Sequence, residues 1–112
     1  MIKSDGLTKK FGSKTVVDSL SFEVASGVVT GFLGPNGAGK STTMRLIMGL
    51  DLPNSGGSLL NGKRVTEIAS PMREVGVLLD AGYVHPTRTA RNHLWALAAS
   101  NSIPKSRVEE VL

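Results

Sequence analysis

The chain is 112 residues long, which leaves room for one small domain, and its 40% hydrophobic and 20% charged residues are typical of a soluble globular protein. It contains no cysteine, which excludes disulfides and thiolate metal sites, and no apolar run near the roughly 20 residues that span a bilayer. The net charge of +4 is spread along the chain and aromatic residues make up only 4%, so we expect no nucleic-acid partner; solvated faces and an anion site account for the charge.

The N-terminal segment predicts several short β-strands. Residues 2–7 and 15–17 read as strands, and in residues 20–24 apolar side chains alternate with polar ones, as in a half-buried strand. A polar turn, residues 9–14, separates the first two and contains a single aromatic residue, Phe11. Closely spaced short strands of this kind predict an antiparallel β subdomain at the start of the chain.

A glycine-rich stretch follows. Residues 34–42 read Gly-Pro-Asn-Gly-Ala-Gly-Lys-Ser-Thr, which fits the phosphate-binding P-loop pattern G-x-x-x-x-G-K-[ST]. Residues 28–33 are mostly apolar and predict a buried strand, and residues 41–50 have the apolar spacing of a helix. The alternative is a glycine-rich turn with a solvated lysine, and the order of strand, loop and helix argues against it.

The residue types of this loop suit a polyphosphate. Glycines permit positive φ and let backbone amides approach closely, and these amides form an anion-binding nest with the start of the following helix. Lys40 supplies a full positive charge for the β- and γ-phosphates, Ser41 supplies a hydroxyl ligand for Mg²⁺, and Thr42 can donate to the α-phosphate. The expected nucleotide-binding residues of the loop are Gly34, Pro35, Asn36, Gly37, Ala38, Gly39, Lys40, Ser41 and Thr42.

Turn residues divide the next part of the chain. Gly49 can serve the C-terminal turn of the helix, and Pro53 prevents its continuation. Residues 58–65 predict a small hairpin around an Asn-Gly turn. Residues 73–80 predict a strand.

Two helices are predicted near the end of the chain. Thr89 is a suitable N-cap for the first, in which Leu94, Leu97 and Ala98 mark an apolar face. Residues 104–112 predict the second, because apolar side chains recur there at helical spacing.

Together these segments are similar to the start of an ABC-type ATPase subunit. Residues 7–12 and 16–22 before the loop, and residues 49–62 after it, resemble the order of motifs in that family, so the resemblance covers nearly the whole chain. It implies an α/β fold, in which an incomplete P-loop core carries an N-terminal antiparallel β subdomain.

The resemblance also implies roles for two residues outside the loop. Phe11 stands where the family has an aromatic ring that stacks on adenine; the alternative, a core residue, is less favoured because its neighbours are polar. Asp80 stands where the family has a glutamine that reaches Mg²⁺ and the attacking water; the alternative is a solvated loop aspartate. ATP and Mg²⁺ are therefore the expected cofactors, with Ser41 and Asp80 as metal ligands.

By the same resemblance, residues 1–112 are expected to form a partial ATP-binding domain that ends before the signature motif and the Walker B strand. The intact parent is expected to hydrolyse ATP and to drive transport through a separate membrane permease, as a dimer at the cytoplasmic face of the membrane. This segment alone is expected to be inactive. Its details are most similar to bacterial antibiotic or multidrug exporters. Two alternatives are another P-loop enzyme, such as a kinase, and an ABC-type protein that acts on ribosomes or DNA.

Overall fold

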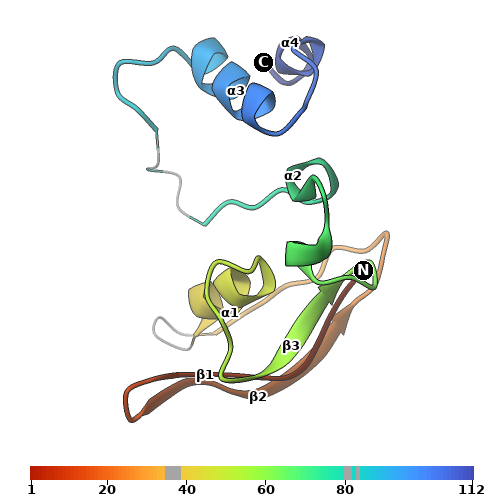
Figure 1. Ribbon diagram of the computed structural model, residues 1–112, viewed down its shortest axis with the longest axis vertical. Helices are drawn as coiled ribbons and strands as arrows, with labels where there is room; N and C mark the ends of the chain where they lie inside the picture. Colours follow the sequence, from red (N-terminus) through yellow and green to blue (C-terminus); the bar gives the residue numbers. More distant parts are fainter. Residues whose placement is uncertain (35–38, 80–81, 83) are drawn as a thin grey trace. The chain divides into compact units, whose positions relative to one another are not determined.

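The computed structural model describes residues 1–34, 39–79, 82 and 84–112 (Figure 1). The chain divides into two compact units, Met1–Ile68 and Ala69–Leu112. Among the described residues, the first contains a sheet, one α-helix and a short 3₁₀ helix, and the second contains three α-helices.

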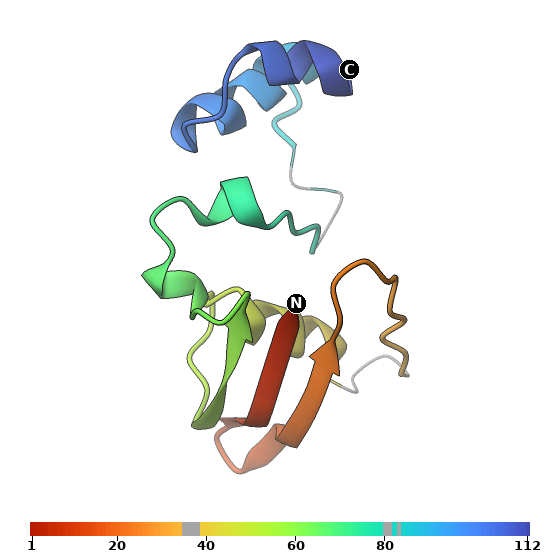
Figure 2. The ribbon, with the colours of Figure 1, turned by 90° about the vertical axis from the view of Figure 1, so that its right-hand side faces the viewer.

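An antiparallel sheet forms the base of the first unit. It consists of β1 (Ile2–Phe11), β2 (Lys14–Val24) and β3 (Ser55–Leu60) in the order β2-β1-β3. Figure 2 shows β1, which carries the N-terminus, between its two partners. The predicted antiparallel β subdomain is confirmed.

The hairpin of β1 and β2 is longer and less interrupted than the sequence predicted. β2 is one strand where residues 15–17 and 20–24 predicted two, and it passes through Ser19 in a left-handed conformation with φ of 47°. Side-chain hydroxyls bridge the irregular register: the Ser19 amide donates to Thr8 Oγ1 at 3.0 Å, and the Gly6 amide donates to Ser21 Oγ at 2.8 Å. These bonds satisfy backbone groups where the ladder shifts, so pairing continues.

The predicted hairpin at residues 58–65 forms only its turn, where Leu60 and Lys63 exchange two backbone hydrogen bonds, and no second strand follows it among the described residues. β3 pairs instead with β1, from Ile2 opposite Leu60 to Thr8 opposite Ser55. Of the hairpin only an isolated bridge between Leu60 and Lys63 remains, and a short 3₁₀ turn, Val65–Glu67, follows it.

Two other predicted strands are absent. Residues 28–33 have no strand structure, and Val29 and Leu33 are 103% and 95% exposed. Residues 73–79 contain the end of α2 (Pro71–Glu74) followed by extended chain without strand structure. A strand requires a neighbour for its backbone groups, and within the described ranges neither segment pairs with one.

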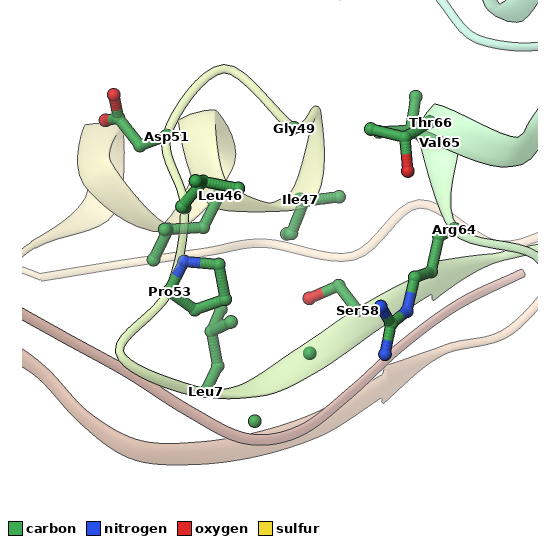
Figure 3. Close-up of a pocket in the computed structure, with 13 residues that line it drawn as sticks. Leu7, Leu46, Ile47, Gly49, Asp51, Pro53, Ser58, Arg64, Val65 and Thr66 are labelled. Carbon is green, nitrogen blue, oxygen red and sulfur yellow. The ribbon is translucent and has the colours of Figure 1, made fainter.

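Helix α1 (Lys40–Ile47) packs on the sheet, where Leu46 joins Leu7 and Val17 in the core. Figure 3 shows Leu46 and Pro53 above Leu7. Each such leucine contributes about 1.5–3 kcal/mol of stability when fully buried. Leu46 therefore anchors the helix to β1 and β2. The apolar face that the spacing predicted is a different one, because Met44 is exposed and Ile47 and Met48 are only half-buried.

The end of α1 is a Schellman motif. The amide of Gly49, at φ of 70°, donates to Leu46 O at 3.1 Å, and the amide of Leu50 donates to Arg45 O at 2.9 Å. The predicted role of Gly49 in the C-terminal turn is confirmed.

The second unit contains α2, α3 (Ala90–Ser100) and α4 (Ser106–Val111). Thr89 caps α3 as predicted, because its Oγ1 accepts the Asn92 amide at 3.1 Å. Ala98 and Val108 are buried. Among the described residues, no helix is long and apolar enough to cross a membrane.

Candidate nucleotide-binding site

The N-terminus of α1 lies directly against β2. Its N-cap residue, Gly39, has φ of 88°, a left-handed conformation that glycine adopts without steric cost. A Cβ at this position would lie 2.6 Å from the backbone oxygen of Val16 and 3.3 Å from Val17 Cγ2. Glycine is required here both by the backbone conformation and by the close approach to the strand.

Thr43 locks the first turn of the helix. Its amide and its hydroxyl both donate to the carbonyl oxygen of Gly39, at 2.8 and 2.7 Å. The Thr43 side chain is buried and has no exposure to a ligand. It fixes the direction in which the first amides of α1 point, and such amides have no partners within a helix.

Lys40 is the first residue of α1, and its ammonium donates a hydrogen bond to the carbonyl oxygen of Gly34. This contact joins the two ends of the glycine-rich loop. Pro35, Asn36, Gly37 and Ala38 lie outside the described residues, so their predicted contacts with phosphate stay predictions. Lys40 is half-buried, whereas Ser41 is exposed.

A hollow at the surface brings the predicted residues together. Its walls come from the end of β1, the start of β2 and the start of α1. The lining residues are Phe11, Lys14, Val16, Gly39, Lys40, Ser41 and Thr42. The sequence separates Phe11 from the loop by more than twenty residues, and the fold places all of them around one space.

Phe11 is 52% exposed, which disagrees with the alternative that it is a core residue. It is the last residue of β1 and pairs with Lys14 across the turn. An exposed ring beside a polar hollow offers a planar apolar surface on which a nucleobase can stack.

The electrostatics of the hollow favour an anion. Both charged residues that line it, Lys14 and Lys40, are cationic. The N-terminus of α1 adds the positive end of a helix dipole and its first amides. A negatively charged chain of phosphates therefore suits this end of the helix, and the exposed Ser41 hydroxyl provides an oxygen of the kind that Mg²⁺ prefers.

The second predicted metal ligand, Asp80, lies outside the described residues. In the part of the chain that the structure describes, no three His, Asp or Glu side chains are grouped to hold a metal ion. Of the two predicted metal ligands, Ser41 is the one that the structure describes, and it lines the hollow.

Sequence reasoning missed two residues of the site, Lys14 and Val16. Lys14 lines the hollow because the β1–β2 register sets it opposite Phe11. Val16 contributes the backbone against which Gly39 packs. The hairpin register was the only signal that could have identified them, and the sequence predicted a polar turn over residues 9–14.

The chain is similar to known transport proteins. Residues 17–112 match the family described as ABC transporter. The Nod factor export ATP-binding protein I of Paraburkholderia xenovorans (strain LB400) is 44% identical over 94 residues, which cover 83% of this chain and 31% of that protein. The Fe(3+) ions import ATP-binding protein FbpC of Brucella abortus (strain 2308) is 35% identical over 106 residues, which cover 95% of this chain and 30% of that protein. The chain thus spans about a third of the length of these relatives.

A solved structure described as an ATP binding subunit of an ABC transporter is also similar. Its TM-score is 0.74 at 27% identity, over 97% of this chain and 46% of that chain. The similarity confirms the expected fold class, an α/β P-loop core with an N-terminal antiparallel β subdomain. The chain therefore belongs to the ABC transporter family, among its ATP-binding subunits.

Proposed function

We propose that the intact protein binds Mg·ATP at the hollow beside α1 and hydrolyses it to drive transport through a membrane permease. The observation that carries this proposal is the hollow itself, in which an exposed aromatic ring, Phe11, and the lysine and hydroxyl groups at the start of α1 line one space. An aromatic ring and a cationic helix N-terminus that line the same space suit a ligand that carries both a base and phosphates.

Each group has a distinct role in the proposed complex. The Phe11 ring stacks on adenine, and Lys40 neutralises the β- and γ-phosphates. Ser41 ligates Mg²⁺, and Thr42 donates to the α-phosphate. The Gly34 carbonyl that now accepts from Lys40 gives up this bond when phosphate binds, because a phosphate oxygen is the stronger acceptor.

The proposed partners are a membrane permease and a second ATP-binding subunit, assembled at the cytoplasmic face of the membrane. Residues 1–112 supply the first part of the ATP-binding domain in this arrangement. We propose export as the direction of transport, since the Nod factor export protein is 44% identical to this chain and the Fe(3+) import protein is 35% identical.

The intact protein, purified with its permease in proteoliposomes, is expected to hydrolyse ATP only when Mg²⁺ is present, and faster with the permease than without it. Phosphate release and ATP binding are measured on the same preparation, with a chelator as the control. Transfer of phosphate to an acceptor other than water would contradict the proposal and favour a kinase. ATP turnover that is indifferent to the permease would favour an ABC-type protein outside transport.

Asp80 is proposed to lie near the metal and to act as a carboxylate. Mg²⁺ binds a hard anionic oxygen more strongly than an amide oxygen, whereas an unpaired carboxylate near phosphate would repel ATP. Asp80→Gln and Asp80→Ala in the intact protein are therefore expected to reduce the dependence of ATP affinity on Mg²⁺. Asp5→Ala, which removes an exposed carboxylate on β1, is the control. If both Asp80 variants keep the wild-type Mg²⁺ dependence and turnover, Asp80 is a solvated loop residue.

A further inference from the structure

Lys9 contacts the ring of Phe11. Its ammonium nitrogen lies 5.2 Å from the ring centroid, within the range of a cation–π contact. The two side chains are two residues apart on β1 and so project from the same face of the strand. Lys9 is half-buried, although lysine is usually exposed, whereas the adjacent Lys10 is exposed.

The loop that follows α1 holds the Lys9 ammonium in place. Lys9 Nζ donates to the carbonyl oxygen of Leu52 at 2.8 Å. The same loop is tied to β1 by the Asn54 amide, which donates to Thr8 O at 2.8 Å. A third bond, from the Lys10 amide to Asn54 Oδ1 at 2.8 Å, leaves the Lys10 side chain uninvolved.

The negative charge of Asp51, in the same loop, also attracts Lys9. Arg45 hydrogen-bonds Asp51 through Nε at 2.9 Å, and this bond, with the charges of Arg45 and Lys9, lowers the pKa of Asp51. Asp51 is therefore ionised and attracts Lys9. Figure 3 shows Asp51 on the loop that runs from Gly49 to Pro53.

The contact on the ring comes from outside the hollow. Phe11 is one of the residues that line the hollow, and Lys9 is not. Phe11 is still 52% exposed with Lys9 against its ring. The ammonium therefore leaves ring surface open to the space that Lys40 and Ser41 also line.

We propose that Lys9 is a positioning residue for nucleobase binding, holding the Phe11 ring from outside the hollow so that its open surface receives the base of the nucleotide. This inference rests on the proposed function. The Leu52 carbonyl restrains the ammonium and the ammonium restrains the ring, which reduces the rotamer freedom that Phe11 loses when a base stacks on it. The positive charge also withdraws electron density from the ring, which favours stacking with an electron-rich purine.

Lys9 should contribute to binding of the base and not to binding of the phosphates. Loss of Lys9 should weaken ligands that carry a base, while inorganic tripolyphosphate, which has the same phosphate chain and no base, should bind as before. A cation–π contact at an exposed site corresponds to about a two- to fivefold change in affinity.

The experiment compares Mg·ATP with Mg·tripolyphosphate on the intact protein by calorimetry. Lys9→Met keeps an unbranched side chain one atom shorter than lysine but removes its charge and its bond to Leu52. We expect the ATP dissociation constant to rise about two- to fivefold and the tripolyphosphate constant to stay unchanged. Lys9→Arg restores ATP affinity, because arginine makes both contacts. Lys10→Met, the matched control, changes neither constant, since the exposed Lys10 side chain makes no hydrogen bond, ion pair or ring contact with the described residues.

The ratio of the two dissociation constants does not depend on the fraction of correctly folded protein, so a poorly folding variant still gives a result. In a Phe11→Leu background, Lys9→Met should change the ratio no further, because Lys9 acts through the ring. An unchanged ratio in Lys9→Met, or the same change in Lys10→Met, would overturn the inference and leave phosphate binding by the loop intact. Failure of the wild-type protein to bind either ligand would instead overturn the proposed function.

Discussion

Lys40→Ala is expected to weaken ATP binding by the intact protein about ten- to a hundredfold. Charge-assisted hydrogen bonds are worth roughly 1.5–3 kcal/mol each when a partner is removed, and 1.4 kcal/mol corresponds to a factor of ten. Lys40 stands at the end of the glycine-rich loop, where its ammonium already contacts a loop carbonyl oxygen. The ATP dissociation constant in the presence of Mg²⁺ is the quantity to measure.

The control for this variant is Lys63→Ala, which removes an equal charge from an exposed turn outside the hollow. It should leave the ATP dissociation constant unchanged. Equal losses in the two variants would mean that overall positive charge attracts ATP without a specific site. An unchanged affinity in folded Lys40→Ala protein would remove the loop from the binding site.

Gly39→Ala is expected to destabilise the protein more than a glycine-to-alanine change at a positive φ where the added Cβ would lie in open space. Two costs combine at this residue. A left-handed conformation costs a non-glycine residue about 1–2 kcal/mol. The new Cβ would also lie 2.6 Å from Val16 O, a backbone atom that cannot move aside alone, and overpacking of this kind costs about 1–3 kcal/mol more.

Gly27→Ala isolates the first cost. Gly27 has φ of 77° and nothing within 4 Å of its added Cβ. Its loss in the free energy of unfolding should be limited to about 1–2 kcal/mol, with ATP affinity unchanged. Gly39→Ala should lose both stability and ATP affinity, because the clash displaces the start of α1 from β2. Denaturant unfolding and ATP binding report the two effects, and equal stability losses in the two variants would show that the clash is relieved by local movement.

The parts of the fold that were predicted correctly depend on local signals. Thr89 caps α3, and Gly49 ends α1, because both effects act within one turn of helix. The predicted strands that failed depend on partners far away in the sequence. The apolar residues 28–33 have the composition of a strand, but no described strand lies beside them. Residues 58–65 form the predicted turn, but no second strand follows it among the described residues, and the long ladder of β3 is with β1.

The residues of the candidate site also differ in whether a local sequence signal or a distant contact brings them to the site. The sequence indicated the loop because its pattern is contiguous, whereas Lys14 joined the site only through strand register. Phe11 is intermediate: the family resemblance suggested its role, and the fold sets it beside the loop. Lys9 acts through two contacts, one of them to a residue 43 positions away, and no spacing rule indicates such a contact.

The order of strands in the sheet has a consequence for how the chain folds. β1 meets β2 through a turn of only two residues, a closure that takes microseconds. β3 reaches β1 only after residues 25–54, which include the glycine-rich loop and α1, have been brought into a closed path. Closing that longer path costs more chain entropy, so we expect β3 to join the sheet last. A nucleotide that binds only the folded site stabilises that site by mass action. We therefore expect bound ATP to favour the folded state in which β3 has joined the sheet.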